Sequence, residues 1–172
     1  RGTKQLTRQQ IQDQLDQNLA TLRGSGEAGQ ATFLIQTKRD KLPVALGILQ
    51  QVLREPSLPK AELEVLRRQS RSDLEQGLTD PQSLAVRTVQ RTLSPYPAND
   101  VRYIPTIEEE LKLLDELDLA AIKRLHAEFL GTQAGQISVV GDFDPDATLA
   151  TLREMLADWT ARIDWPAKVR LT

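Results

Sequence analysis

Hydrophobic residues recur every three or four positions along most of this chain, which is the spacing of amphipathic helices. The clearest example starts at Leu42, continues through Leu53 and stops at Glu55-Pro56. Further helices are predicted over residues 7–17, from residue 60 to about 78, and after Asp80-Pro81, Thr106, Asp118 and Asp144. Helices therefore account for most of the predicted fold.

Capping residues mark several of these helix ends. Two capping boxes, in which a hydroxyl and a glutamine or glutamate three residues later satisfy backbone N–H groups, are Thr7 with Gln10 and Thr106 with Glu109. Asp144 before Pro145 predicts the start of the last helix. Gly131 predicts a left-handed cap on the preceding helix. We expect the helix after Asp118 to bury Leu119, Ile122, Leu125 and Phe129. We expect the helix after Asp144 to bury Leu149, Leu152, Met155, Leu156 and Trp159.

Three segments have the composition of strands. Residues 30–37, with Phe33-Leu34-Ile35 at their centre, predict one strand, and residues 19–23 predict its weaker partner. The glycine-rich residues 24–29 predict the hairpin turn, and residues 136–140 predict a third strand. This order predicts a single α+β domain over residues 1–172, with helices packed on one side of an antiparallel-containing sheet. Because the sheet looks incomplete, we expect further strands from upstream of Arg1.

The composition is that of a globular domain and excludes several classes of protein. The chain has 172 residues, of which 40% are apolar and 27% charged, with a formal net charge of −2. No basic patch with interleaved aromatics is present, which argues against a nucleic-acid partner. No apolar run approaches the roughly 20 residues that span a bilayer. There is no cysteine, so disulfides and thiolate zinc sites are excluded.

Candidate chemical motifs are few, and each has a structural explanation. Residues 24–29 match G-x-G-x-x-G, but a β-rich segment follows where a dinucleotide site needs a helix. His126 is the only histidine, so no two-histidine zinc site can form, and we expect this side chain at the surface or boundary. Helix capping and the helix dipole explain the acidic residues 108–110, Asp142, Asp144 and Asp146. The basic residues Arg67, Arg68 and Arg71 are expected to pair with Glu64, Asp73 and Glu75. We therefore predict no catalytic residue and no metal ligand in this chain.

Several short stretches, taken in order, resemble the peptidase domain of the pitrilysin/insulinase family of zinc metallopeptidases. They are Gly2-Thr3 before a polar helix, Lys41-Leu42-Pro43-Val44-Ala45-Leu46 up to Pro56, Leu58-Pro59 to Leu66, Asp80-Pro81, Pro105-Thr106-Ile107-Glu108-Glu109, and Val139-Val140-Gly141-Asp142-Phe143-Asp144. Together they cover nearly the whole chain. Their order and spacing, rather than any single stretch, make the resemblance.

The resemblance implies a place for this chain in a larger enzyme. The family binds zinc through H-x-x-E-H and a later glutamate, and the first glutamate is the base for a zinc-bound water. The histidine motif would fall just upstream of Gly2, and the later glutamate near Asp73, where aspartate reaches less far. The chain therefore resembles the first domain of the non-catalytic half, with zinc in the catalytic half of the parent enzyme. The implied fold is that of the mitochondrial-processing-peptidase-like metallohydrolases without their leading strands, and the implied location is the bacterial periplasm or envelope.

The resemblance also implies partners and a binding site. The catalytic half, in the same protein or in a partner subunit, would enclose a peptide chamber together with this chain. An extended peptide substrate would add to the edge of the hairpin, with Thr32, Leu34 and Gln36 as its contacts. Two alternatives stay open: a catalytic domain truncated just after H-x-x-E-H, and a peptidase-derived scaffold subunit without proteolytic activity.

Overall fold

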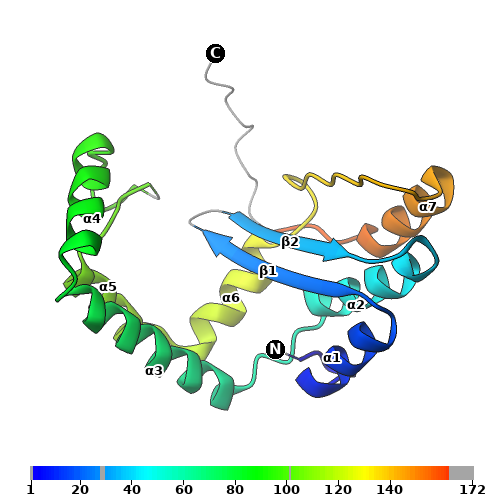
Figure 1. Cartoon of the computed structure of the whole chain (residues 1–172), viewed down its shortest axis with the longest axis horizontal. Coiled ribbons are helices and arrows are strands. Elements are labelled where there is room, and N and C mark those ends of the chain that lie inside the picture. Colours follow the sequence, from blue (N-terminus) through cyan, green and yellow to red (C-terminus); the bar gives the residue numbers. More distant parts are fainter. Residues whose placement is uncertain (1, 28–29, 101, 163–172) are drawn as a thin grey trace. The chain divides into compact units, whose positions relative to one another are not determined.

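The computed structural model describes residues 2–27, 30–100 and 102–162, which form seven α-helices and one two-stranded antiparallel sheet (Figure 1). The elements are α1 (Arg8–Gln17), β1 (Thr21–Glu27), β2 (Gln30–Gln36), the 3-10 turn η1 (Arg39–Lys41), α2 (Leu42–Arg54), α3 (Lys60–Gly77), α4 (Pro81–Leu93), α5 (Ile107–Glu116), α6 (Leu119–Phe129) and α7 (Pro145–Leu156). The predicted α+β class is confirmed.

The fold divides into two compact units. The first unit comprises residues 1–23, 33–58 and 120–172, and the second comprises residues 24–32 and 59–119. The single domain expected from the sequence stays a prediction, because compact units of one chain can also be lobes of one domain. No helix in the described residues is long and apolar enough to cross a membrane.

The hairpin differs from its prediction in length. β1 continues through Gly24, Ser25 and Gly26, so three residues predicted as turn belong to the strand. Only residues 28 and 29, which lie outside the described residues, separate β1 from β2. Glycine can occupy the strand because the ladder joins backbone N–H and C=O groups and needs no side chain.

Two small clusters of buried side chains form the core of the first unit. They consist of Leu15, Ala20, Ala45 and Ile48, and of Leu46, Leu152 and Met155. Ile35 of β2 packs against both clusters, which fixes β2 on α2 and α7. Ile48 of α2 is only 2% exposed. Leu125 and Leu149 were wrongly predicted as buried, because no described element covers them and they are 57% and 48% exposed.

Polar side chains close the ends of two helices in the first unit. The Arg54 guanidinium donates from Nη1 to the backbone oxygens of Met155 and Ala157, at 3.1 and 2.8 Å, and so caps the end of α7. His126 Nε2 lies 2.7 Å from the Leu53 carbonyl oxygen. That oxygen can only accept, so Nε2 holds the proton. The half-buried position of His126 confirms its predicted place at the boundary.

The segment after α6 departs from two predictions. Gly131 has no positive φ and is therefore not a left-handed cap. The chain instead passes so close that a Cβ at Gly131 would lie 2.2 Å from Ala161 N. Residues 136–140 form no strand, although three of the five are β-branched. A strand needs a partner for its backbone groups, and no described strand is paired with this segment.

Arginine side chains join α3 to α5 in the second unit. Arg67 donates to a backbone oxygen just after α5, and Arg71 pairs with Asp115. Two of the predicted pairs along α3 are present, Arg67 with Glu64 at 3.1 Å and Arg71 with Glu75 at 3.6 Å, whereas Arg68 and Asp73 form no ion pair in the described residues. Arg67 and Arg71 are thus tied to carboxylates and a carbonyl of their own unit.

Helix starts follow the capping residues in both units. The capping boxes predicted at Thr7 with Gln10 and at Thr106 with Glu109 are formed. Asp80 and Asp144 accept from backbone N–H groups at the starts of α4 and α7. α4 leaves its apolar positions open, since Leu84, Val86, Val89 and Leu93 are 40% to 77% exposed. Side-chain caps therefore mark the starts of α1, α4, α5 and α7, whereas burial of the apolar faces depends on neighbours.

Candidate functional site

The predicted peptide contacts lie together on an open face of β2. Thr32, Leu34 and Gln36 occupy alternate positions, and alternate side chains of a strand point to the same face. All three side chains are exposed, Leu34 by 53%. Ile35, which points to the opposite face, packs into the core. β2 therefore exposes Thr32, Leu34 and Gln36 and is held in the core through Ile35, while Phe33, on the same face as Ile35, is 36% exposed.

The backbone of β2 has an edge without a strand partner in the described residues, because the sheet contains only β1 and β2. Such an edge presents N–H and C=O groups that an added strand can pair with. The Thr32 hydroxyl accepts from Gln30 Nε2 at 3.1 Å and can still donate its own proton. Chemically, the backbone of β2 can bind the backbone of an extended peptide, and Leu34 can favour apolar side chains of that peptide.

Asp73 lies in the second unit, on α3. It lines a hollow of about 530 Å³ together with Ser70, Leu74, Glu110, Leu113, Leu114 and Leu117. Two carboxylates and a hydroxyl fall short of the three or four strong ligands that a zinc ion takes. In the described residues no group of three or more histidine, aspartate and glutamate side chains could hold a metal ion.

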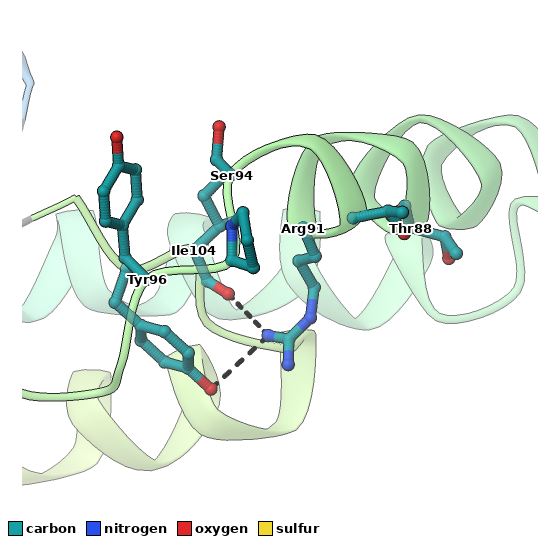
Figure 2. Close-up of a pocket in the computed structure, with 8 residues that line it drawn as sticks. Thr88, Arg91, Ser94, Tyr96 and Ile104 are labelled. Carbon is teal, nitrogen blue, oxygen red and sulfur yellow. Dashed lines mark hydrogen bonds between the residues drawn. The ribbon is translucent and has the colours of Figure 1, made fainter.

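A second hollow, of about 410 Å³, lies where the chain turns back after α4 (Figure 2). Its lining residues are Thr88, Arg91, Thr92, Ser94, Pro95, Tyr96, Tyr103 and Ile104. Arg91 donates to the Ile104 carbonyl oxygen and to Tyr103 Oη, the latter at 3.5 Å. No motif in the sequence predicted this hollow, and the arginine and tyrosine residues around the proline-rich turn were the available signal.

An ion pair and an aromatic ring brace the same turn. Arg102 donates to both carboxylate oxygens of Asp100, at 2.9 and 2.7 Å, and its guanidinium lies 3.8 Å from the centroid of the Tyr96 ring. The hydrogen bonds from Arg102 lower the pKa of Asp100 to about 2. Arg91 and Arg102 are thus engaged by groups of the chain itself. Their arrangement accounts for the shape of the turn and leaves β2 as the candidate site.

No protein-family model matches this chain, and no curated protein sequence matches it.

Proposed function

We propose that this chain is a domain of the non-catalytic half of a zinc peptidase of the pitrilysin/insulinase type. In this role it walls the peptide chamber and holds an extended peptide on β2, while the zinc ion belongs to the catalytic half. The observation that supports the proposal is the open face and edge of β2, on which Thr32, Leu34 and Gln36 are all exposed.

The geometry of β2 suits a peptide held for cleavage elsewhere. Each backbone hydrogen bond to an added strand contributes about 0.5–1.5 kcal/mol net, whatever the peptide sequence. Several such bonds hold a peptide extended without demanding one sequence. The half-exposed Leu34 side chain adds a preference for an apolar neighbour, since burying apolar surface contributes about 25 cal/mol per Å².

The test combines this chain with the polypeptide that bears H-x-x-E-H in the same parent protein. Cleavage of a fluorogenic peptide is measured for the wild-type chain and for Leu34→Glu. We expect Leu34→Glu to lower kcat/KM about tenfold, mainly through KM, since about 1.4 kcal/mol of lost binding is one decade. Leu113→Glu is the matched control, because Leu113 on α5 is 58% exposed and lies outside β2.

The outcomes separate the alternatives. Hydrolysis that needs both polypeptides and weakens only in Leu34→Glu supports the proposal. Hydrolysis at background in every mixture indicates a scaffold subunit instead. One zinc ion per isolated chain, measured by elemental analysis, contradicts the assignment of zinc to the other half.

A further inference from the structure

The hollow of about 530 Å³ beside Asp73 lies within the second unit, between α3 and α5. α3 supplies Ser70, Asp73 and Leu74, and α5 with its C-cap supplies Glu110, Leu113, Leu114 and Leu117. Four of these lining residues are leucines, of which Leu113 is 58% exposed and the other three are half-buried. This leucine hollow is therefore an apolar surface left open between two packed helices.

α5 has more apolar positions than its contact with α3 buries. Ile107 is 3% exposed, and a Cβ at Gly77 of α3 would lie 3.3 Å from its Cδ1 atom, so α3 covers this side of α5. Leu113 and Leu117 lie one turn apart on an adjacent side of α5, and both line the hollow. This second apolar stripe is the surface that a further element would bury.

Asp73 leaves one uncompensated negative charge on the wall of the leucine hollow. Its side chain makes no hydrogen bond or ion pair in the described residues. Its neighbours three and four positions away along α3 are Gln69, Ser70, Gln76 and Gly77, none of which is basic. Arg68 lies five positions away, on another face of the helix. Other basic side chains of the unit pair with their own carboxylates: Arg67 with Glu64, Arg71 with Asp115, Arg87 with Glu110 and Lys112 with Glu116.

The occupant of the hollow has to satisfy its own backbone groups. The only polar side chains in the lining are Ser70, Asp73 and Glu110, and the backbone groups in the body of a helix are already bonded along it. An extended strand laid on the leucines would leave N–H and C=O groups without partners. A helix bonds its own backbone, and the lined stretch of α5, residues 110–117, is about 10 Å long, which is two helical turns.

We propose that the leucine hollow docks an amphipathic helix of a partner polypeptide, with large apolar side chains at i, i+4 and i+7 and a lysine or arginine beside them. The apolar side chains cover Leu113 and Leu117, and the cation pairs with Asp73. Apolar burial supplies most of the affinity, and the ion pair selects a basic helix. The inference does not depend on peptide binding at β2. The partner is a polypeptide other than the catalytic half, so Leu113→Glu should leave peptide cleavage unchanged.

Two other occupants fit the leucine hollow less well. Strands from upstream of Arg1 would pair with the backbone of β1 or β2, whereas the hollow offers no backbone edge. A second copy could offer α4, whose apolar positions are open, but Arg87 and Arg91 of α4 already bind groups of their own chain. A second copy that used α6, which carries Lys123 and Arg124, is distinguished by sedimentation.

Titration of the full chain with a helical probe peptide tests this inference. The probe is acetyl-Ser-Ala-Leu-Gln-Ala-Lys-Leu-Ala-Gln-Leu-Gln-Ala-Gln-Ala-amide, and its control has glutamine in place of the lysine. NMR titration should give a Kd about two- to fivefold lower for the lysine probe, which is the factor that an exposed ion pair supplies. Asp73→Asn should remove this difference and leave the thermal midpoint unchanged, because Asp73 pairs with no described group.

Two further variants separate the apolar and the charged contribution. Leu113→Gln should raise the Kd of both probes about fivefold, because it takes an apolar side chain out of the lining. Glu154→Gln is the matched control for Asp73→Asn, since it removes one carboxylate from an exposed position on α7, outside the second unit. It should bind both probes as the wild type does.

Other outcomes overturn the inference in distinguishable ways. Equal Kd values for the two probes on the wild type refute the pairing with Asp73, and absence of binding by both probes refutes the docking of a helix. An equal loss of selectivity in Glu154→Gln shows that net charge is responsible and refutes the role of Asp73. A wild-type chain that sediments as a dimer and becomes monomeric in Leu113→Gln shows that a second copy is the occupant, which also refutes the inference.

Discussion

Replacing Gln133 by glutamate exchanges one NH₂ group for an oxygen at a contact that joins two distant parts of the first unit. The Gln133 amide brackets the backbone of Ala161: Nε2 donates to the Ala161 carbonyl oxygen at 2.9 Å, and Oε1 accepts from Ala161 N at 2.8 Å. At neutral pH, glutamate keeps the acceptor and loses the donor. The Ala161 carbonyl oxygen then faces a second oxygen instead of an N–H group.

The size of the destabilisation follows from the loss of the hydrogen-bond donor to the Ala161 carbonyl oxygen. Leaving a buried acceptor without its donor costs about 1–3 kcal/mol. Because water reaches the exposed Gln133 side chain, we expect the lower part of this range, about 1–2 kcal/mol. That cost increases the local opening equilibrium about 5- to 30-fold. The exchange rate of the Ala161 amide, measured as the ratio of variant to wild type, should rise by this factor.

The stability deficit of Gln133→Glu should depend on pH. A protonated carboxyl group can donate to the Ala161 carbonyl oxygen, so the fold favours the protonated form and raises the pKa of the introduced carboxyl above its unfolded value of about 4.3. Protonation of this carboxyl therefore stabilises the folded variant. This stabilisation is fully present below the unfolded pKa and is lost as the pH rises through the higher folded pKa. The variant should therefore approach wild type below about pH 4 and show its full deficit at neutral pH.

The matched control is Gln136→Glu, which makes the same chemical change at an exposed side chain without a hydrogen bond in the described residues. It should leave the exchange of the Ala161 amide unchanged at every pH. Equal effects of the two variants at neutral pH would show that net charge, and not the bracket, is responsible. A deficit that persists at low pH would refute the assignment of the lost donor.

Three further predictions address the core, the α5 cap and the close approach at Gly131. Ile48→Ala should lower the free energy of urea unfolding by about 2–5 kcal/mol, because it opens a cavity, whereas Val86→Ala, at a side chain 51% exposed, should change it by less than about 0.5 kcal/mol. The hydrogen bond from the Thr106 backbone N–H lowers the pKa of Glu109 in the folded protein. The ionised Glu109 side chain therefore adds stability above its unfolded pKa, and this stability is lost as the pH falls through the lower folded pKa. Glu109→Gln keeps the capping box and should reduce the loss in urea midpoint between pH 7 and pH 3. Gly131→Ala should lower the thermal midpoint and speed exchange at Ala161, since its Cβ would meet backbone; an unchanged midpoint would contradict that contact.

Local signals in the sequence predicted the helices well. The hydroxyls of Thr7 and Thr106 bind backbone N–H groups three residues on, and Asp144 does the same before Pro145. These contacts lie within one turn of chain, so composition and spacing are sufficient to find them. In β2, by contrast, exposure does not alternate, because residues 30–34 and Gln36 are all exposed and only Ile35 is half-buried.

Contacts between distant segments could not be predicted from local sequence signals. Nothing near Gly131 in sequence shows that residue 161 will pass within contact distance, so a left-handed cap was the natural expectation. Residues 136–140 have strand composition but no described partner, and strand formation depends on the partner as much as on propensity. The Arg91 and Tyr103 contact beside the second hollow likewise joins residues on either side of a proline-rich turn.

The sequence by itself determined the α+β class and the capped starts of α1, α4, α5 and α7. It did so because capping, helical periodicity and strand pleating are set by residues within a few positions of one another. Only the tertiary structure decided that Ile35 joins two core clusters, that Gln133 binds both backbone groups of Ala161, and that residues 136–140 have no strand partner among the described residues. Each of these depends on which distant segment packs alongside, and local composition holds no information about that neighbour.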